Sequence, residues 1–137
     1  MHRLAIALSG MLVWTGAVWT GTGLAQTAAP SPGIPYDTVA AALAALKAKP
    51  GVKFSTGDGW TFADDTDGAQ WSFTPPNHYA NPSVGRRELH QQGGRFFVVT
   101  RILCEAQKPA CDRLNKDYER LNQRMNEAIQ RDLQKKK

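Results

Sequence analysis

The sequence predicts an α+β domain with an N-terminal helix, an antiparallel meander of about five strands and a long C-terminal helix packed on one sheet face. Three observations near the C-terminus predict it. Residues 94–105 (GRFFVVTRILCE) are rich in β-branched and aromatic side chains, which favours a strand. Residues 109–133 carry apolar side chains at spacings of three and four, the stripe of an amphipathic helix. Cys104 and Cys111 stand where these two elements meet.

The two faces of this last strand differ in composition, because side chains alternate across a strand. One face is apolar apart from a threonine, and we assign it to the core: Phe96, Val98, Thr100, Ile102 and Cys104. The other face mixes apolar and charged groups: Arg95, Phe97, Val99, Arg101, Leu103 and Glu105. We expect this mixed face to point away from the helices.

The cysteines predict one structural disulfide. Cys104 lies on the core face of the strand and Cys111 on the apolar stripe of the helix, so both thiols point into one interface. A redox pair would usually be Cys-x-x-Cys, and a metal site would need more ligands than His78 and His90 can add. No metal or other cofactor is expected. A disulfide needs an oxidising compartment.

The first 25 residues resemble a secretory signal peptide. Arg3 gives a positive start, residues 4–18 are apolar, and the small residues of Gly23–Ala25 suit cleavage before Gln26. The apolar stretch is shorter than the about 20 residues that a membrane span needs. We therefore expect a periplasmic or secreted protein with no membrane span after cleavage. An uncleaved membrane anchor is the alternative.

The remaining chain predicts a short lead-in and a single domain. Residues 26–35 (QTAAPSPGIP) have the composition of a disordered segment, and residues 36–137 form the domain. Residues 37–49 predict a helix capped by Asp37. Short strands follow at 52–55, 60–64 and 69–74, each giving two large apolar groups to one side. We expect the core to lie under both helices, on the same sheet face.

Residues 84–92 predict a fourth strand with few apolar groups. Arg86, Glu88 and His90 share one face, and the turn at Gly93-Gly94 joins this strand to the last one. So polar a strand is typical of a sheet edge, where charge prevents pairing with another chain.

Two loops invite a functional interpretation. Asp64, Asp65 and Asp67 precede Gly68, but the spacing of an EF-hand is not met, so a solvated turn is favoured. Residues 74–83 (TPPNHYANPS) are rich in proline and carry His78 and Tyr79 at their centre. This loop is either a rigid connection or a recognition loop.

The stretch Trp71-Ser72-Phe73-Thr74-Pro75, followed by the histidine-containing loop, Pro82-Ser83-Val84 and paired arginines, resembles a group of small exported proteobacterial proteins without an assigned activity. The resemblance covers most of the domain, through to the helix that follows Cys111. Its motifs are aromatic and structural, so it implies export and a shared fold rather than a reaction.

The charge of the chain limits the partners. The formal net charge is +5, and basic residues outnumber acidic ones from Arg86 to the C-terminus. In an exported protein nucleic acid is not an expected partner, whereas an acidic protein, peptidoglycan or anionic lipid head groups are. The oligomeric state cannot be inferred. We expect non-catalytic binding of a protein partner, for example as an inhibitor or assembly accessory, with binding of envelope components as the alternative.

A small hydrolase is the second alternative, with Glu88 and His90 as an acid–base pair. No serine stands in a Gly-x-Ser-x-Gly sequence. The candidate binding residues are those left outside the expected core, together with the two residues of the proline-rich loop: Phe97, Val99, Arg101, Leu103, Arg86, Glu88, His90, His78 and Tyr79.

Overall fold

A five-stranded antiparallel sheet and a long C-terminal helix form the frame of the protein. The structure is a computed structural model that describes residues 33–136. Its elements in chain order are α1 (Val39–Ala48), β1 (Lys53–Gly57), β2 (Trp60–Asp64), β3 (Gln70–Phe73), β4 (Ser83–Gln92), β5 (Arg95–Cys104) and α2 (Lys108–Lys135). The strands lie in the order β1-β2-β3-β4-β5. The predicted sheet and the predicted long helix are thus confirmed. The expected signal peptide lies outside the described residues.

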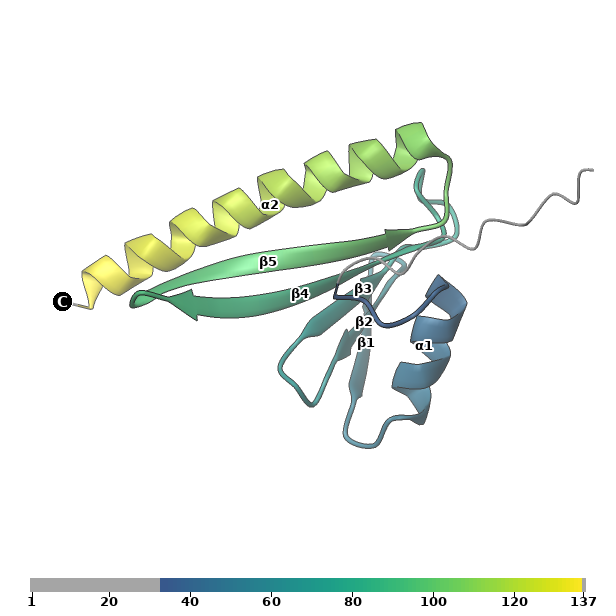
Figure 1. Cartoon of the computed structure of the whole chain (residues 1–137), viewed down its shortest axis with the longest axis horizontal. Coiled ribbons are helices and arrows are strands. Elements are labelled where there is room, and N and C mark those ends of the chain that lie inside the picture. Colours follow the sequence, from purple (N-terminus) through teal and green to yellow (C-terminus); the bar gives the residue numbers. More distant parts are fainter. Residues whose placement is uncertain (1–32, 137) are drawn as a thin grey trace, which may run out of the picture.

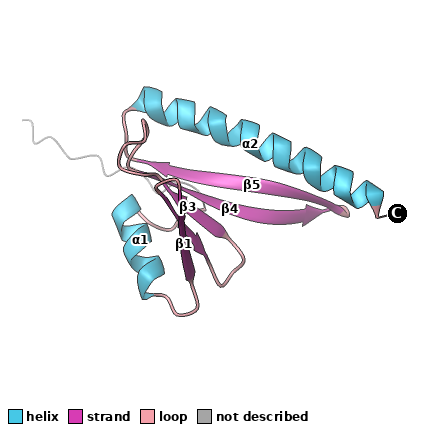
Figure 2. Cartoon of the chain, turned by 180° about the vertical axis from the view of Figure 1, so that it is seen from behind, coloured by secondary structure: helices cyan, strands magenta, loops and turns pink. Residues whose placement is uncertain are grey.

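The last two strands are much longer than the first three and extend beyond them (Figure 1). β3 pairs with β4 only from Val84 to Arg87, whereas β4 pairs with β5 along its whole length. Residues 88–92 and 95–99 therefore form a two-stranded hairpin arm, along which α2 runs (Figure 2). The prediction that the fourth strand is an edge is wrong for residues 84–87, which are central. It holds for residues 88–92, which have no partner on the β3 side.

The two helices cover opposite faces of the sheet, which corrects the expectation that both cover one face (Figure 1). The reason is the register between β2 and β3. Trp71 stands opposite Ala63, so Trp71 points to one face while Phe62, the next residue along β2, points to the other. The core on the α1 face consists of Ile34, Val39, Ala42, Leu46, Ala63, Trp71, Phe73, Val84 and Leu103. The smaller core on the α2 face consists of Ala80, Leu114 and Tyr118, with Ile102 and Leu121 packed against it.

The N-terminal end of α1 is tied to the rest of the domain by side chains. The Thr38 hydroxyl, rather than the expected Asp37, caps the helix by accepting a hydrogen bond from Ala41 N–H at 3.1 Å. The carboxylate of Glu105 accepts a second bond from Val39 N–H at 2.9 Å. Ile34 is buried to 1% exposure. The expectation of a disordered lead-in is therefore wrong at Ile34, and residues 26–32 lie outside the described part of the chain.

The predicted disulfide is confirmed. Cys104 ends β5 and Cys111 lies in the first turn of α2, with their Cα atoms 5.8 Å apart. The bond joins the start of α2 to the end of β5 that lies away from the hairpin arm. None of the helices among residues 33–136 is long and apolar enough to cross a membrane.

Candidate binding groove

The α2 face of the sheet is only partly covered, which leaves a groove beside the helix. α2 lies over β5, so the α2-facing side chains of β2 have no helix above them. The resulting groove has a volume of about 490 Å³, in the range of ligand sites. Its lining consists of Gly57, Asp58, Trp60, Phe62, Ser72, His78, Tyr79, Arg87, Leu114, Asp117, Tyr118 and Leu121.

Aromatic rings from β2 and the proline-rich loop form one continuous wall of this groove. Trp60 stacks on Phe62 with ring centroids 6.4 Å apart, and Trp60 and His78 make an edge-to-face contact with centroids 5.1 Å apart. Tyr79 follows at 4.3 Å from His78. Trp60 and Phe62 remain half-exposed, and Tyr79 is 38% exposed. Rings that are both apolar and accessible are typical of a binding surface.

The proline-rich loop is held firmly against α2. His78 Nδ1 accepts a hydrogen bond from Ala80 N–H at 3.1 Å, and Ala80 is fully buried beside Leu114 and Tyr118. The loop therefore lies on the α2 face and not over Phe97, which is on the opposite face. The candidate residues His78 and Tyr79 are thus separated from the other seven.

The helix wall is positioned by a close contact with the sheet. The Tyr118 hydroxyl and Ser72 Oγ are 2.8 Å apart, a buried hydrogen bond. Gly85 makes room for this ring, since a Cβ atom there would lie 2.8 Å from the Tyr118 hydroxyl. The preceding residue of α2, Asp117, accepts hydrogen bonds from both Tyr79 and Arg120. Sequence reasoning missed this side of the site because it placed the first three strands and α2 around a single core.

Several pKa values in the groove are shifted by burial and by neighbouring charge. Burial lowers the pKa of His78, with Arg113 acting in the same direction and Asp117 against it. Burial and the bond to Asp117 raise the pKa of Tyr79 to about 12. The hydrogen bond from Tyr79 in turn lowers the pKa of Asp117, aided by the charges of Arg120 and Arg113. At neutral pH the groove thus holds a neutral imidazole, a neutral phenol and a carboxylate that is already paired.

Arg86 and Arg87 are neighbours in β4 with different surroundings. Arg86 bonds to Asp67 at 2.7 Å and to Glu88 at 2.6 Å on the α1 face, and its guanidinium lies over Trp71. Arg87 points into the groove and makes no ion pair with any described residue. It donates from Nη1 to Gln70 Oε1 at 3.2 Å, while its Nε is buried without a partner.

The remaining candidates lie on the α1 face, on the hairpin arm and on the adjoining parts of β4 and β5. Glu88 is surrounded by Arg86 at 2.6 Å, His90 at 3.6 Å and Arg101 at 3.9 Å. His90 also stacks on Phe97, with 5.7 Å between centroids. Because Glu88 contacts two guanidinium groups as well as His90, this geometry favours an ion-pair network over an isolated acid–base pair.

The burial of three residues on β5 limits the open binding surface that was expected on this face. Leu103 is only 6% exposed and belongs to the core under α1, so its assignment to an open binding surface is wrong. Val99 and Arg101 are half-buried. The expected surface is therefore reduced to the hairpin arm, where Phe97 and Val99 are flanked by the charges around Glu88.

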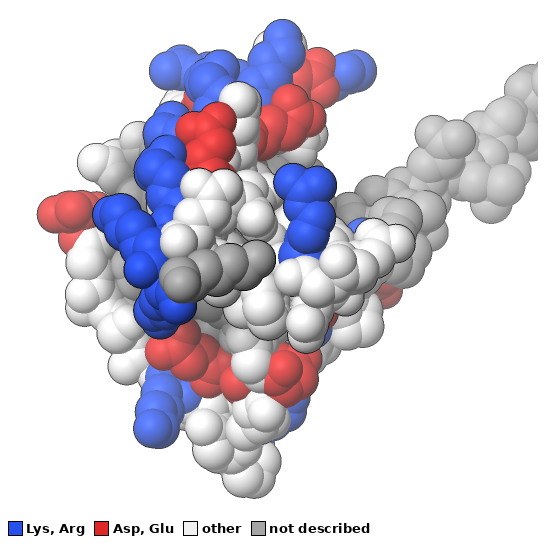
Figure 3. Space-filling model, turned by 90° about the vertical axis from the view of Figure 1, so that its left-hand side faces the viewer, with Lys and Arg blue, Asp and Glu red and all other residues white. Residues whose placement is uncertain are grey.

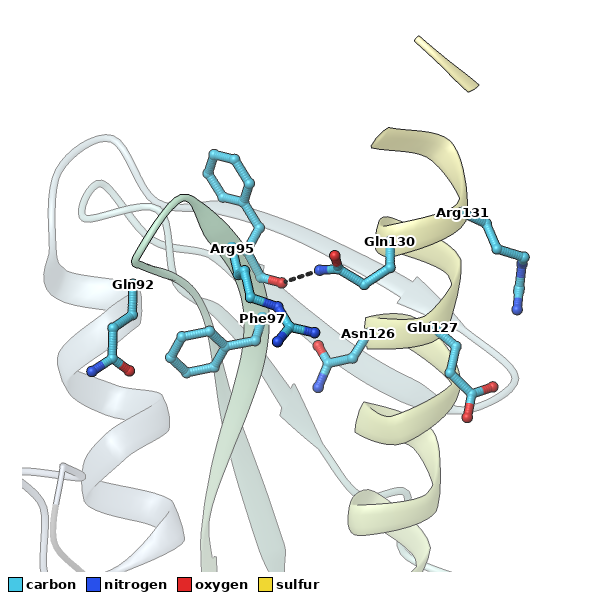
Figure 4. Close-up of a pocket in the computed structure, with 8 residues that line it drawn as sticks. Gln92, Arg95, Phe97, Asn126, Glu127, Gln130 and Arg131 are labelled. Carbon is cyan, nitrogen blue, oxygen red and sulfur yellow. Dashed lines mark hydrogen bonds between the residues drawn. The ribbon is translucent and has the colours of Figure 1, made fainter. Parts of the chain in front are cut away.

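A row of polar side chains on α2 covers the free edge of β5, a feature that the sequence analysis missed. Asn126 Oδ1 accepts a hydrogen bond from Val98 N–H at 2.6 Å. Gln130 Nε2 donates to the Phe96 carbonyl at 3.0 Å, the bond drawn dashed in Figure 4. Asn122 Oδ1 accepts from the Thr100 hydroxyl at 2.8 Å. These three residues recur every fourth position, so amides at helical spacing next to the apolar stripe were the available signal.

Charge is distributed unevenly over the surface. Viewed from the end of the hairpin arm, Lys and Arg side chains run down one flank and gather again at the top (Figure 3). The loop with Asp64, Asp65 and Asp67 makes contacts within the domain, because Asp65 bonds to Lys49 at 2.6 Å and accepts a hydrogen bond from the Trp71 indole N–H at 3.3 Å.

Among residues 33–136 there is no group of three or more acids, histidines or cysteines that could hold a metal ion.

Comparison of the chain with models of protein families, with curated proteins and with solved structures finds no match. The resemblance to small exported proteins therefore stays a prediction. Functional inference rests on the groove and the hairpin arm.

Proposed function

We propose that this is an exported, non-catalytic binding protein that holds a segment of a partner protein in the aromatic groove. The observation that carries the proposal is the wall of accessible rings formed by Trp60, Phe62, His78 and Tyr79. Aromatic side chains supply much of the binding energy in protein interfaces, and a firmly held loop lowers the entropic cost of binding.

The signal-like residues 1–25 and the disulfide both support the proposed compartment. Mass spectrometry of fractionated cells tests it. The expected product is an exported chain that begins near Gln26 with both cysteines oxidised. A cytoplasmic chain that retains residues 1–25 would contradict the proposal.

A matched pair of aromatic substitutions tests the site. Trp60→Ala removes the centre of the wall, whereas Phe54→Ala removes a ring that is 40% exposed on the α1 face of the edge strand β1. We expect Trp60→Ala to abolish cross-linking to the partner in the exported compartment and Phe54→Ala to leave it unchanged. Both variants should keep the fold, which circular dichroism checks.

The hairpin arm provides the competing site. Phe97→Ser removes an apolar group of the arm, and Arg101→Glu reverses a charge next to Glu88, while neither residue lines the groove. If this double variant abolishes cross-linking and Trp60→Ala does not, the partner binds the arm. If purified peptidoglycan or anionic vesicles compete with the partner, the alternative function of binding envelope components gains support.

A further inference from the structure

We propose that the groove recognises an extended peptide segment in which a carboxylate side chain pairs with Arg87 and an apolar side chain four positions away lies on Trp60. This inference rests on the proposed function and adds the chemistry of the bound segment.

Within residues 33–136, the groove offers one unpaired positive charge to a ligand. Three charged residues line it: Asp58, Arg87 and Asp117. Asp117 already accepts bonds from Tyr79 and Arg120, and Asp58 is exposed on the turn after β1. Arg87 is half-buried and has no acidic partner among the described residues, which leaves a positive group available to a ligand. A half-buried guanidinium favours a carboxylate, with which it forms strong charge-assisted bonds.

A row of hydrogen bonds orients Arg87. Gln70 accepts from Arg87 and donates through Nε2 to Asp64 Oδ1 at 3.2 Å. Arg87, Gln70 and Asp64 stand opposite one another on neighbouring strands, so these bonds form one row across the sheet. The row holds the guanidinium in place before a ligand arrives, which reduces the cost of ordering it.

The separation of Arg87 and Trp60 sets the spacing of the side chains that a ligand would place on them. The row that contains Arg87 crosses β2 at Asp64, and Trp60 lies four residues away on the same face of that strand. Four extended residues span about 13 Å along β2, and Arg87 lies two strands, roughly 10 Å, to the side, so the Cα atoms of Arg87 and Trp60 are about 16 Å apart. The guanidinium of Arg87, which reaches Gln70 on the strand between them, covers part of this distance. In an extended ligand, side chains at positions i and i+4 point to the same side. An acid and an apolar residue at that spacing would therefore reach Arg87 and Trp60 together.

The neighbouring arginine provides a matched control. Arg86 is one residue away in the same strand, but it faces α1 and is paired with Asp67 and Glu88. Neutralising Arg87 should change the ligand preference, while neutralising Arg86 should change only stability.

The test is selection of random nine-residue peptides displayed on phage, using the exported full chain with its disulfide formed. We expect enrichment of peptides with Asp or Glu four positions from an aromatic or aliphatic residue. Arg87→Gln should retain the apolar preference, lose the acidic one and weaken the best peptide by roughly 10- to 100-fold. Arg87→Lys should keep the acidic preference, and Arg86→Gln should leave the selection unchanged.

The other outcomes separate the two proposals. Enrichment of apolar peptides without an acid would overturn the role of Arg87 and leave the groove as the binding site. If no peptide is enriched and peptidoglycan fragments bind in an Arg87-dependent way, peptide recognition is wrong. If neither binds, the proposed function itself fails.

Discussion

The Tyr118 ring lies directly over Gly85, and its hydroxyl reaches Ser72 Oγ at 2.8 Å. This contact brings α2 close to the centre of the sheet and leaves the aromatic groove open beside it. A glycine within a strand usually marks such a close approach. It also explains why a central strand of the sheet carries a glycine at position 85.

Gly85→Ala should destabilise the domain. The added Cβ would lie 2.8 Å from the Tyr118 hydroxyl and 2.9 Å from Cζ, so the ring must move and the bond to Ser72 is weakened. Overpacking of this kind costs about 1–3 kcal/mol, which lowers Tm by roughly 5–20 °C in a domain of this size. Thermal unfolding measures it. In a Tyr118→Leu background the same substitution should cost much less, and an equal cost in both backgrounds would show that the contact is not responsible.

Removal of the disulfide should destabilise the domain without abolishing the fold. The bond closes a loop with a sequence separation of 7 between Cys104 and Cys111. In the chain-entropy model this contributes about 2–3 kcal/mol, so Cys104→Ala with Cys111→Ala should lower Tm by roughly 8–20 °C. A reducing agent should lower the Tm of the wild type similarly and leave the double variant unchanged. Free thiols in the folded, exported protein would contradict the structure.

The pKa of His78 makes stability depend on pH. Burial lowers it from 6.5, so the folded protein favours the neutral ring. Stability from this group is complete above pH 6.5 and falls as pH drops from there toward the lower folded value, because the unfolded chain binds the proton first. NMR titration of the imidazole gives the midpoint. Asp117→Asn should lower it further and Arg113→Gln should raise it, since these charges act in opposite directions. The reverse order would contradict this assignment.

Most element boundaries could be predicted, because they follow from local patterns. β2 agrees with the expected residues 60–64, and the stripe from Cys111 to Leu133 predicted α2. The distribution of elements over the two sheet faces could not be predicted. It depends on the register that sets Trp71 opposite Ala63 instead of Phe62, and a shift of one residue reverses every side chain. The groove was missed for this reason, although two of the candidate residues named from the sequence, His78 and Tyr79, line it.

Amide side chains of α2 protect the free edge of β5 from pairing with another strand. Asn126 Oδ1 accepts from Val98 N–H, and Gln130 donates to the Phe96 carbonyl, so backbone groups that could pair with another chain are occupied. Asn126→Ala should leave Val98 N–H without its partner, at a cost of about 1–2 kcal/mol. Hydrogen exchange should become faster at Val98, and sedimentation should show more self-association at high protein concentration.

Gln123→Ala is the matched control, because Gln123 is exposed and its amide bonds to Glu127 on the same helix. It removes an amide from α2 without opening the edge, so exchange at Val98 and sedimentation should match the wild type. Unchanged exchange at Val98 in Asn126→Ala would contradict the prediction, because it would mean that the bond to Asn126 does not protect this N–H from solvent. Faster exchange without self-association would mean that the remaining contacts of α2 are enough to keep another strand away from β5.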